Sequence, residues 1–113
     1  MQIEVKGRNV PVTEELREHV SRRFDKISKQ VSELAVLEIE VSKERNPANP
    51  ECQVAEATLH LKGTTLRACE HSDDMGHSVN LLAEDLHRQV KRHRDKRRRR
   101  REATRAQPQP GAP

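Results

Sequence analysis

Four short segments of the chain alternate apolar and polar residues, which is typical of strands with one buried face. They cover residues 2–6, 34–43, 52–62 and 65–69. The residues predicted to face the core in the last three segments are Leu37, Ile39, Val41, Ala55, Ala57, Leu59, Leu61, Leu66 and Ala68. The outward positions include Val54 and the acids Glu38, Glu40 and Glu56. A tight turn at Lys62-Gly63 is predicted to join the last two strands into a hairpin.

Two further segments repeat apolar residues every three or four positions, which predicts helices with one apolar face. The first spans about 13–31, with Thr13 as its N-cap and an apolar face of Leu16, Val20, Phe24, Ile27 and Val31. The second is expected to open at Ser72-Asp73-Asp74, with a cap and two first-turn acids, and to reach about residue 100. Its apolar stripe is Met75, Val79, Leu82, Leu86 and Val90.

The resulting order β-α-β-β-β-α predicts an α+β fold, in which two helices pack on one face of a four-stranded sheet. The other sheet face is expected to be polar and exposed. We expect one domain over residues 1–101, whose basic helix end covers 88–101, and a disordered tail over 102–113. A loop containing Asn46-Pro47 and Asn49-Pro50 is expected between the second and third strands.

The 113-residue chain has a net charge of +4, which is unevenly distributed. Residues 1–87 hold 11 basic and 16 acidic residues, whereas residues 88–113 hold 11 basic and two acidic ones. An acidic body with a basic end predicts a polyanionic partner, either nucleic acid or, as the alternative, an anionic membrane surface. The sequence shows neither an apolar run of about 20 residues nor the apolar core of a secretory signal, so we expect a cytoplasmic protein.

Basic residues on both predicted helices are the candidates for binding RNA. They are Arg22, Arg23, Lys26 and Lys29 on the first helix, and Arg88, Lys91, Arg92, Arg94 and Lys96 on the second. The planar fork of arginine suits phosphate, and helices on one side of a sheet would let both basic stripes form one groove. The competing interpretations are a solvated helix face with an internal Asp25–Lys29 pair, and a merely solubilising run from Arg97 to Arg101.

Phe24 is the one aromatic residue of the chain, and it lies on a predicted helix. Sheet-based readers of single-stranded RNA stack bases on aromatic side chains. The composition therefore argues against sequence-specific readout of single strands and favours backbone and shape recognition of structured RNA.

A group of potential metal ligands lies where the last strand meets the last helix: Cys69, His71, Asp73 and His77. Their spacing fits no zinc pattern, and no third group is evident that would orient a Cys69–His71 catalytic pair. The predicted hairpin places Cys69 opposite Glu56, about 13 Å along the strand from Cys52, which is too far for a disulfide. We expect free thiols in a reducing cytosol, and no metal, cofactor, small-molecule substrate or catalytic residue.

Three segments together carry a family resemblance. They are MQIEVKGRNV followed by Thr13-Glu-Glu-Leu-Arg-Glu-His-Val, the hairpin Ala57-Thr-Leu-His-Leu-Lys-Gly, and Asp74-Met75 followed by Leu86-His-Arg-Gln-Val-Lys-Arg-His-Arg-Asp-Lys96. They resemble the ribosome hibernation-promoting factors and the related ribosome-associated inhibitor, over about residues 1–96. The resemblance implies a fold similar to the double-stranded-RNA-binding domain. It also implies binding to the small ribosomal subunit, in the channel that holds mRNA and tRNA.

The resemblance carries the family's RNA contacts over to part of the basic set, namely Arg23, Lys26, Lys29, Arg88, Arg92 and Lys96. Three positions depart from the family: Gly76 replaces its usual Tyr, Asp85 stands where Lys is frequent, and Asn80 replaces a frequent Asp. The arginine run is longer than usual. Long members add a C-terminal dimerisation domain, and we expect this chain to be of the short form and monomeric off the ribosome.

Together these observations predict a non-enzymatic translation inhibitor that occupies the decoding channel in stress or stationary phase, excluding tRNA and mRNA. One alternative is a general structured-RNA-binding protein. Another is a protein adaptor that binds a basic partner through the acidic outer sheet face.

Overall fold

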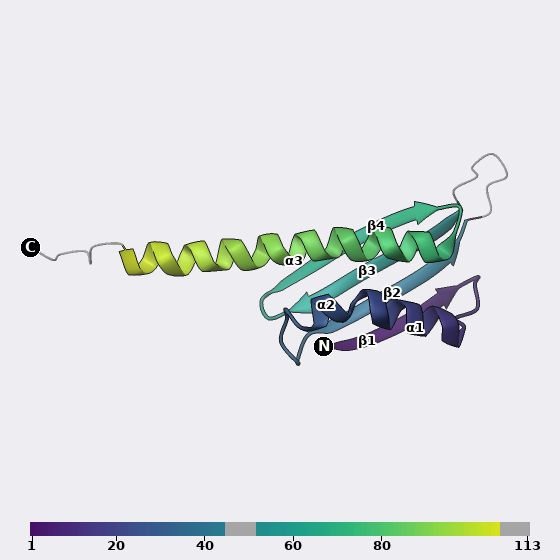
Figure 1. The fold of residues 1–113 in the computed structure, drawn as a ribbon, viewed down its shortest axis with the longest axis horizontal. Coiled ribbons are helices and arrows are strands. Elements are labelled where there is room, and N and C mark those ends of the chain that lie inside the picture. The colour runs from purple at the N-terminus through teal and green to yellow at the C-terminus, as the bar shows by residue number, and fades with distance from the viewer. Residues whose placement is uncertain (45–51, 107–113) are drawn as a thin grey trace, which may run out of the picture.

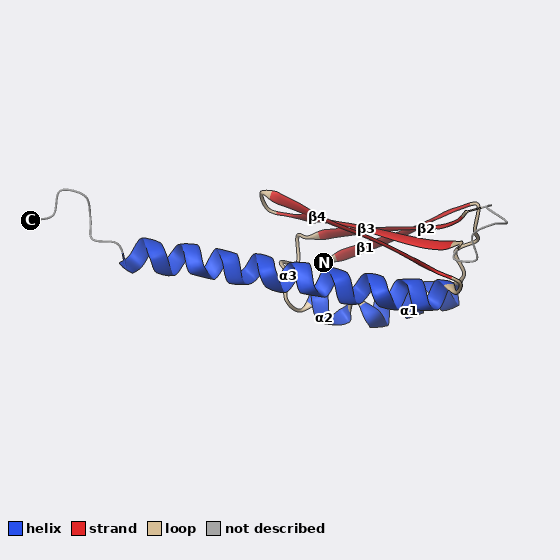
Figure 2. Cartoon of the chain, turned by 90° about the horizontal axis from the view of Figure 1, so that it is seen from above, coloured by secondary structure: helices blue, strands red, loops and turns tan. Residues whose placement is uncertain are grey.

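A computed structural model of the chain describes residues 1–44 and 52–106, with side chains as far as Arg100. The elements are β1 (Gln2–Arg8), α1 (Glu14–Arg23), α2 (Asp25–Ser28), β2 (Val36–Lys43), β3 (Gln53–Leu61), β4 (Thr64–Ser72) and α3 (Met75–Ala106). All three helices lie on one face of a four-stranded sheet, as Figures 1 and 2 show from two sides. The predicted α+β class and its two-layer arrangement are confirmed. The expected Asn-Pro loop and the end of the tail, residues 107–113, lie outside the described residues.

The strands follow one another across the sheet in the order β1-β2-β3-β4. β1 and β2 are parallel, because α1 and α2 cross over between them, and the other two pairs are antiparallel. Gly63 has a φ of 77°, the left-handed value that lets the chain turn tightly between Leu61 and its partner Thr64. This hairpin pairs Cys69 with Glu56 as predicted.

The core lies between the sheet and the helices and contains the predicted inward residues. The side chains buried there from both layers include Val20, Phe24, Ile27, Leu37, Ile39, Val41, Leu59, Val79, Leu82, Leu86 and Val90. The sequence pattern placed Val54 on the exposed outer face, and this expectation of exposure is wrong. Val54 points to the outer face but is only 7% exposed. Its cross-strand neighbours Ser42 and His71 lie on either side of it, so position on the polar face did not mean exposure.

The single helix predicted over 13–31 is interrupted at Phe24. Its φ of −95° and ψ of 4° leave the α-helical range, so that α1 ends at Arg23 and α2 ends at Ser28. Backbone hydrogen bonds still run through the break, from the Phe24 N–H to the Val20 carbonyl and from the Ser28 N–H to the Phe24 carbonyl. The apolar spacing predicted which side is buried, and both Phe24 and Ile27 reach the core.

α3 begins later than predicted and continues further. Asp73 and Asp74 both precede the helix, and the Asp74 carboxylate accepts a hydrogen bond of 3.0 Å from the His77 N–H, so Asp74 is a cap rather than a first-turn acid. At the other end the helix continues to Ala106, past the predicted end near residue 100. Within the described part of the chain, no helix is both long and apolar enough to cross a membrane.

The start of α3 is tied to two strands by a buried pair of hydroxyl groups. Ser78 is fully buried and donates a hydrogen bond of 2.7 Å to the Gln53 carbonyl of β3. Its Oγ also lies 2.7 Å from the Ser72 Oγ at the end of β4. Ser72 in turn lies 2.6 Å from the Asp74 carbonyl. These contacts fix the start of α3 against β3 and β4, and therefore the direction in which its basic end extends.

Candidate nucleic-acid interface

The predicted basic residues of the first helical segment are held outward by buried neighbours. Arg22 and Arg23 end α1, and Lys26 lies in α2, between the fully buried Phe24 and Ile27. All three cationic side chains are exposed. Because the apolar residues pack into the core, the cations are directed away from the sheet and toward solvent.

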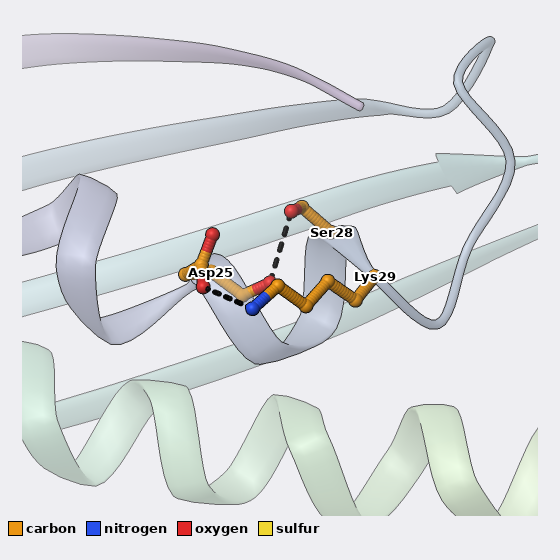
Figure 3. A network of polar contacts seen from close by, with 3 residues as sticks. All are labelled: Asp25, Ser28 and Lys29. Atoms are coloured by element: carbon orange, nitrogen blue, oxygen red, sulfur yellow. Dashed lines mark hydrogen bonds and ion pairs between the residues drawn. The ribbon is translucent and has the colours of Figure 1, made fainter.

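Lys29 is also exposed, but it has an intramolecular partner. Its Nζ lies 3.1 Å from Asp25 Oδ2, the helical pair that the sequence suggested as an alternative (Figure 3). The Ser28 hydroxyl donates a hydrogen bond of 2.9 Å to the Asp25 carbonyl beside it. An exposed pair of this kind contributes only about 0.3–0.5 kcal/mol, so Lys29 can exchange Asp25 for a phosphate.

A groove of about 280 Å³ lies between α3 on one side and α1 and α2 on the other. Its first wall carries Arg22, Arg23 and Lys26, as predicted. Its α3 wall is not the predicted basic stripe but consists of Asn80, Ala83, Glu84 and His87. The groove is therefore basic on one side and mixed on the other.

The predicted basic residues of α3 form a second group. Arg88, Lys91, Arg92 and Lys96 line a separate concave surface of about 490 Å³ along α3, together with Asp95 and Arg99. With about 100° between successive residues, Arg88 and Arg92 are turned away from Asn80 and His87, whereas Lys91, four residues after His87, lies on the same side one turn further along α3. The structure thus brings the predicted residues together in two groups rather than one. Arg94 is exposed on α3, and like Lys29 it lines neither surface.

Sequence reasoning missed the residues that form the α3 wall of the groove. Two buried polar atoms there, Asn80 Oδ1 and His87 Nδ1, have no hydrogen-bond partner among the described residues. His87 follows Leu86 and precedes Val90 by three residues, so periodicity places it at the edge of the apolar stripe. Glu84 is two residues from both Leu82 and Leu86 and lies nearly opposite the stripe, so periodicity provides no such signal for it. The orientation of α3 toward α1 is what turns these positions into a groove wall.

Asp85, a departure from the family pattern, lies outside both basic surfaces. Its Oδ1 is 3.4 Å from Gln89 Nε2, which also donates a 2.8 Å hydrogen bond to the Arg67 carbonyl of β4. The carboxylate is half-buried on the side of α3 that faces β4. It therefore belongs to the contact between the helix and the sheet edge.

The cysteine and histidine cluster provides no metal centre within the residues that the structure describes. Cys52 and Cys69 are both free thiols. Partial burial, followed by the neighbouring Glu56 carboxylate, raises the pKa of the Cys69 thiol above its ordinary value. The Cys69 Sγ lies 3.8 Å from Glu56 Oε1 on the outer sheet face, and a thiol with a raised pKa is a weaker nucleophile at neutral pH.

The outer sheet face carries the predicted acids. Glu38, Glu40 and Glu56 are all exposed there. Glu38 Oε2 lies 3.3 Å from His60 Nε2 on the neighbouring strand. Lys6 and Arg67 are exposed on the same face, so these glutamates lie on a face of mixed charge, opposite the basic groups of the helices.

Comparison with known proteins gives a family and a fold. The family described as "Sigma 54 modulation protein / S30EA ribosomal protein" matches residues 3–98. The chain is 31% identical over 96 residues to a ribosome hibernation promoting factor of Salmonella typhimurium, covering 85% of this chain and 96% of that protein. It is 30% identical to the factor of the same name from Escherichia coli K12, with the same coverage.

Two solved structures share the fold at lower identity. A ribosomal subunit interface protein from Coxiella burnetii aligns with a TM-score of 0.71 at 24% identity, covering 84% of this chain and 99% of that one. The N-terminal domain of Protein Y from Thermus thermophilus aligns with a TM-score of 0.69 at 22% identity, covering 82% and 99%. From the match over residues 3–98, the chain belongs to the Sigma 54 modulation protein / S30EA ribosomal protein family, among the relatives named ribosome hibernation promoting factors.

Proposed function

We propose that this protein is a ribosome hibernation factor, which binds the ribosomal RNA of the small subunit and inhibits translation by occupying the decoding channel. It acts in the cytoplasm as a non-enzymatic protein, is monomeric off the ribosome, and excludes tRNA and mRNA by occupying their space. The relatives named ribosome hibernation promoting factors support the biological setting. The basic surfaces support the mode of binding.

The observation that carries this proposal is the exposure of all nine predicted cations on the helices: Arg22, Arg23, Lys26, Lys29, Arg88, Lys91, Arg92, Arg94 and Lys96. The opposite sheet face is mixed in charge, with exposed glutamates beside Lys6 and Arg67. A phosphate surface attracts the cation-rich helices more strongly than the mixed sheet face, so the charge distribution orients the protein on RNA. No aromatic platform lies on a strand, which agrees with contacts to the RNA backbone rather than to bases.

The experiment that tests the proposal is co-sedimentation with purified small ribosomal subunits over a salt series, with and without bound tRNA and mRNA. We expect saturation near one protein per subunit and loss of binding when tRNA occupies the channel. Each phosphate contact contributes about 0.7–0.9 to the slope of log affinity against log salt. Binding that does not saturate, or that ignores tRNA, would contradict the proposal.

The decisive variant reverses two exposed cations of α3, Arg88→Glu and Arg92→Glu together. It should lower the slope by about 1.4–1.8 and weaken binding at least tenfold at moderate salt. The matched control is Lys6→Glu with Arg67→Glu, which makes the same charge change at exposed positions of the outer sheet face. If both variants lose binding equally, net charge rather than the α3 surface is responsible.

A general structured-RNA-binding function is the second candidate. The basic surface along α3 favours it, because backbone contacts carry no sequence information. Competition with bulk double-stranded RNA separates the two functions. A hibernation factor stays on the subunit in a large excess of competitor, whereas a general binder is displaced in proportion to phosphate concentration.

A further inference from the structure

The last part of α3 lies beyond the sheet. Val90 is buried and Gln89 contacts β4, but every side chain from Arg94 to Arg100 is exposed. Figure 1 shows the helix projecting past the end of the sheet, and we call residues 94–106 the α3 extension. The family match ends at residue 98, whereas the helix continues to Ala106. The extension is thus partly outside the shared domain, and burial in the core does not explain the composition of residues 94–100.

Cations surround residues 94–100 of the α3 extension on all sides. Every residue from 94 to 100 except Asp95 is basic. With about 100° between successive residues, Arg97 and Arg99 point about 200° apart, on nearly opposite sides of the helix. The same holds for Arg94 and Lys96. In the part of α3 that packs on the sheet, one side is occupied by the apolar core, so its cations are confined to the remaining sides.

This distribution does not suit a helix that lies on a flat phosphate surface. Such a helix uses one side only, and half of the cations would face water. Neighbouring like charges three and four residues apart also repel and destabilise the helix. Phosphates on both sides of the helix would remove this repulsion and use the whole circumference. Structured RNA offers that environment where a bulge or loop widens the otherwise narrow deep groove of an A-form helix, so that phosphate backbones flank an inserted helix on both sides.

We propose that the α3 extension is a second RNA-binding site, which inserts between two phosphate backbones of a structured RNA. The groove between α1 and α3 contacts RNA from one side, whereas the extension is enclosed by it; Lys96 and Arg99 belong both to the extension and to the concave surface along α3, which therefore forms one of its sides. That this RNA is ribosomal rests on the proposed function; the enclosed mode of binding rests on the geometry of the extension.

The test compares Arg97→Gln with Arg99→Gln, which remove one cation each from opposite sides of the extension. Full-length protein is titrated with purified small ribosomal subunits between 50 and 200 mM salt, and in parallel with a bulged RNA hairpin. Each variant is expected to lower the slope of log affinity against log salt by about 0.7–0.9. Between 50 and 200 mM salt, the factor by which each variant loses affinity is therefore about one third of the factor for the unmodified protein. Lys6→Gln, on the outer sheet face, is the control and leaves the slope unchanged.

A response of only one of the two variants would overturn the proposal in favour of a one-sided contact. A response of neither would show that the extension does not touch RNA. The proposed function is judged separately, by whether tRNA displaces the unmodified protein from the subunit. If tRNA has no effect while both variants change the slope equally on the hairpin, the decoding-channel assignment fails and the enclosed mode of binding stands.

Discussion

Replacing Ser78 with Ala tests whether the buried hydroxyl pair holds α3 on the sheet. Ser78 is fully buried, and the substitution removes its 2.7 Å hydrogen bond to the Gln53 carbonyl and its 2.7 Å contact with Ser72 Oγ. Each hydrogen bond contributes about 0.5–1.5 kcal/mol net, and the Gln53 carbonyl loses a buried donor. Ser72 still has the Asp74 carbonyl at 2.6 Å. We therefore expect the free energy of unfolding to fall by about 1–3 kcal/mol.

Urea unfolding followed by circular dichroism measures this loss, provided that the slope of free energy against urea stays the same. The matched control is Ser28→Ala, which makes the same chemical change at a half-buried position, where the hydroxyl forms a solvent-exposed hydrogen bond to the Asp25 carbonyl within its own helix. We expect the control to change stability by less than about 0.5 kcal/mol.

The reasoning would be refuted if Ser78→Ala and Ser28→Ala had equal effects, or if Ser78→Ala were neutral. A double-mutant cycle with Ser72→Ala isolates the contact between the two hydroxyls. A coupling energy near zero would show that Ser72 relies on Asp74 alone.

Three further predictions concern the groove, the hairpin and the outer sheet face. Asp25→Asn removes the ion-pair partner of Lys29, which lies 3.1 Å away. Lys29 then binds phosphate without first losing an ion pair that contributes about 0.4 kcal/mol, so affinity for the small subunit should rise about twofold in the co-sedimentation assay. Gly63→Ala places a Cβ at a φ of 77° and should lower the free energy of unfolding by about 1–2 kcal/mol in urea. Glu56→Gln removes a carboxylate that raises the pKa of Cys69, so a larger fraction of the thiol is ionised at pH 8. Alkylation of Cys69 by iodoacetamide should therefore become faster, and an unchanged rate would mean that burial alone raises this pKa.

Local periodicity by itself determined the order of the elements and which side of each is buried. Alternation with a period of two placed Leu37, Ile39 and Val41 in the core, and the structure buries all three. The two-residue turn at Lys62-Gly63 predicted the register of the last hairpin, including Cys69 opposite Glu56. These features depend on residues that are close in sequence, so the chain alone specifies them.

The charge pattern of the sequence also predicted the basic residues of the candidate interface, although not their arrangement. All nine predicted cations are exposed, because charged residues opposite an apolar stripe must face solvent. Their division into two groups was not predicted. It depends on the rotation of α3 and on which stretch of α3 lies against α1, which together place Asn80 and His87 rather than Arg88 and Arg92 across from Arg22.

Only the tertiary structure decided the features in which distant segments meet. The break at Phe24 separates α1 from α2 within one continuous apolar pattern, and Val54 is buried by its cross-strand neighbours on the polar face. Ser72 and Ser78 join the start of α3 to β4 and to Gln53 of β3, although nothing in their local sequence marks them as a pair. The physical reason is the same in each case: sequence periodicity reports which side of an element is apolar, whereas burial, rotation and polar partners depend on what packs against that side.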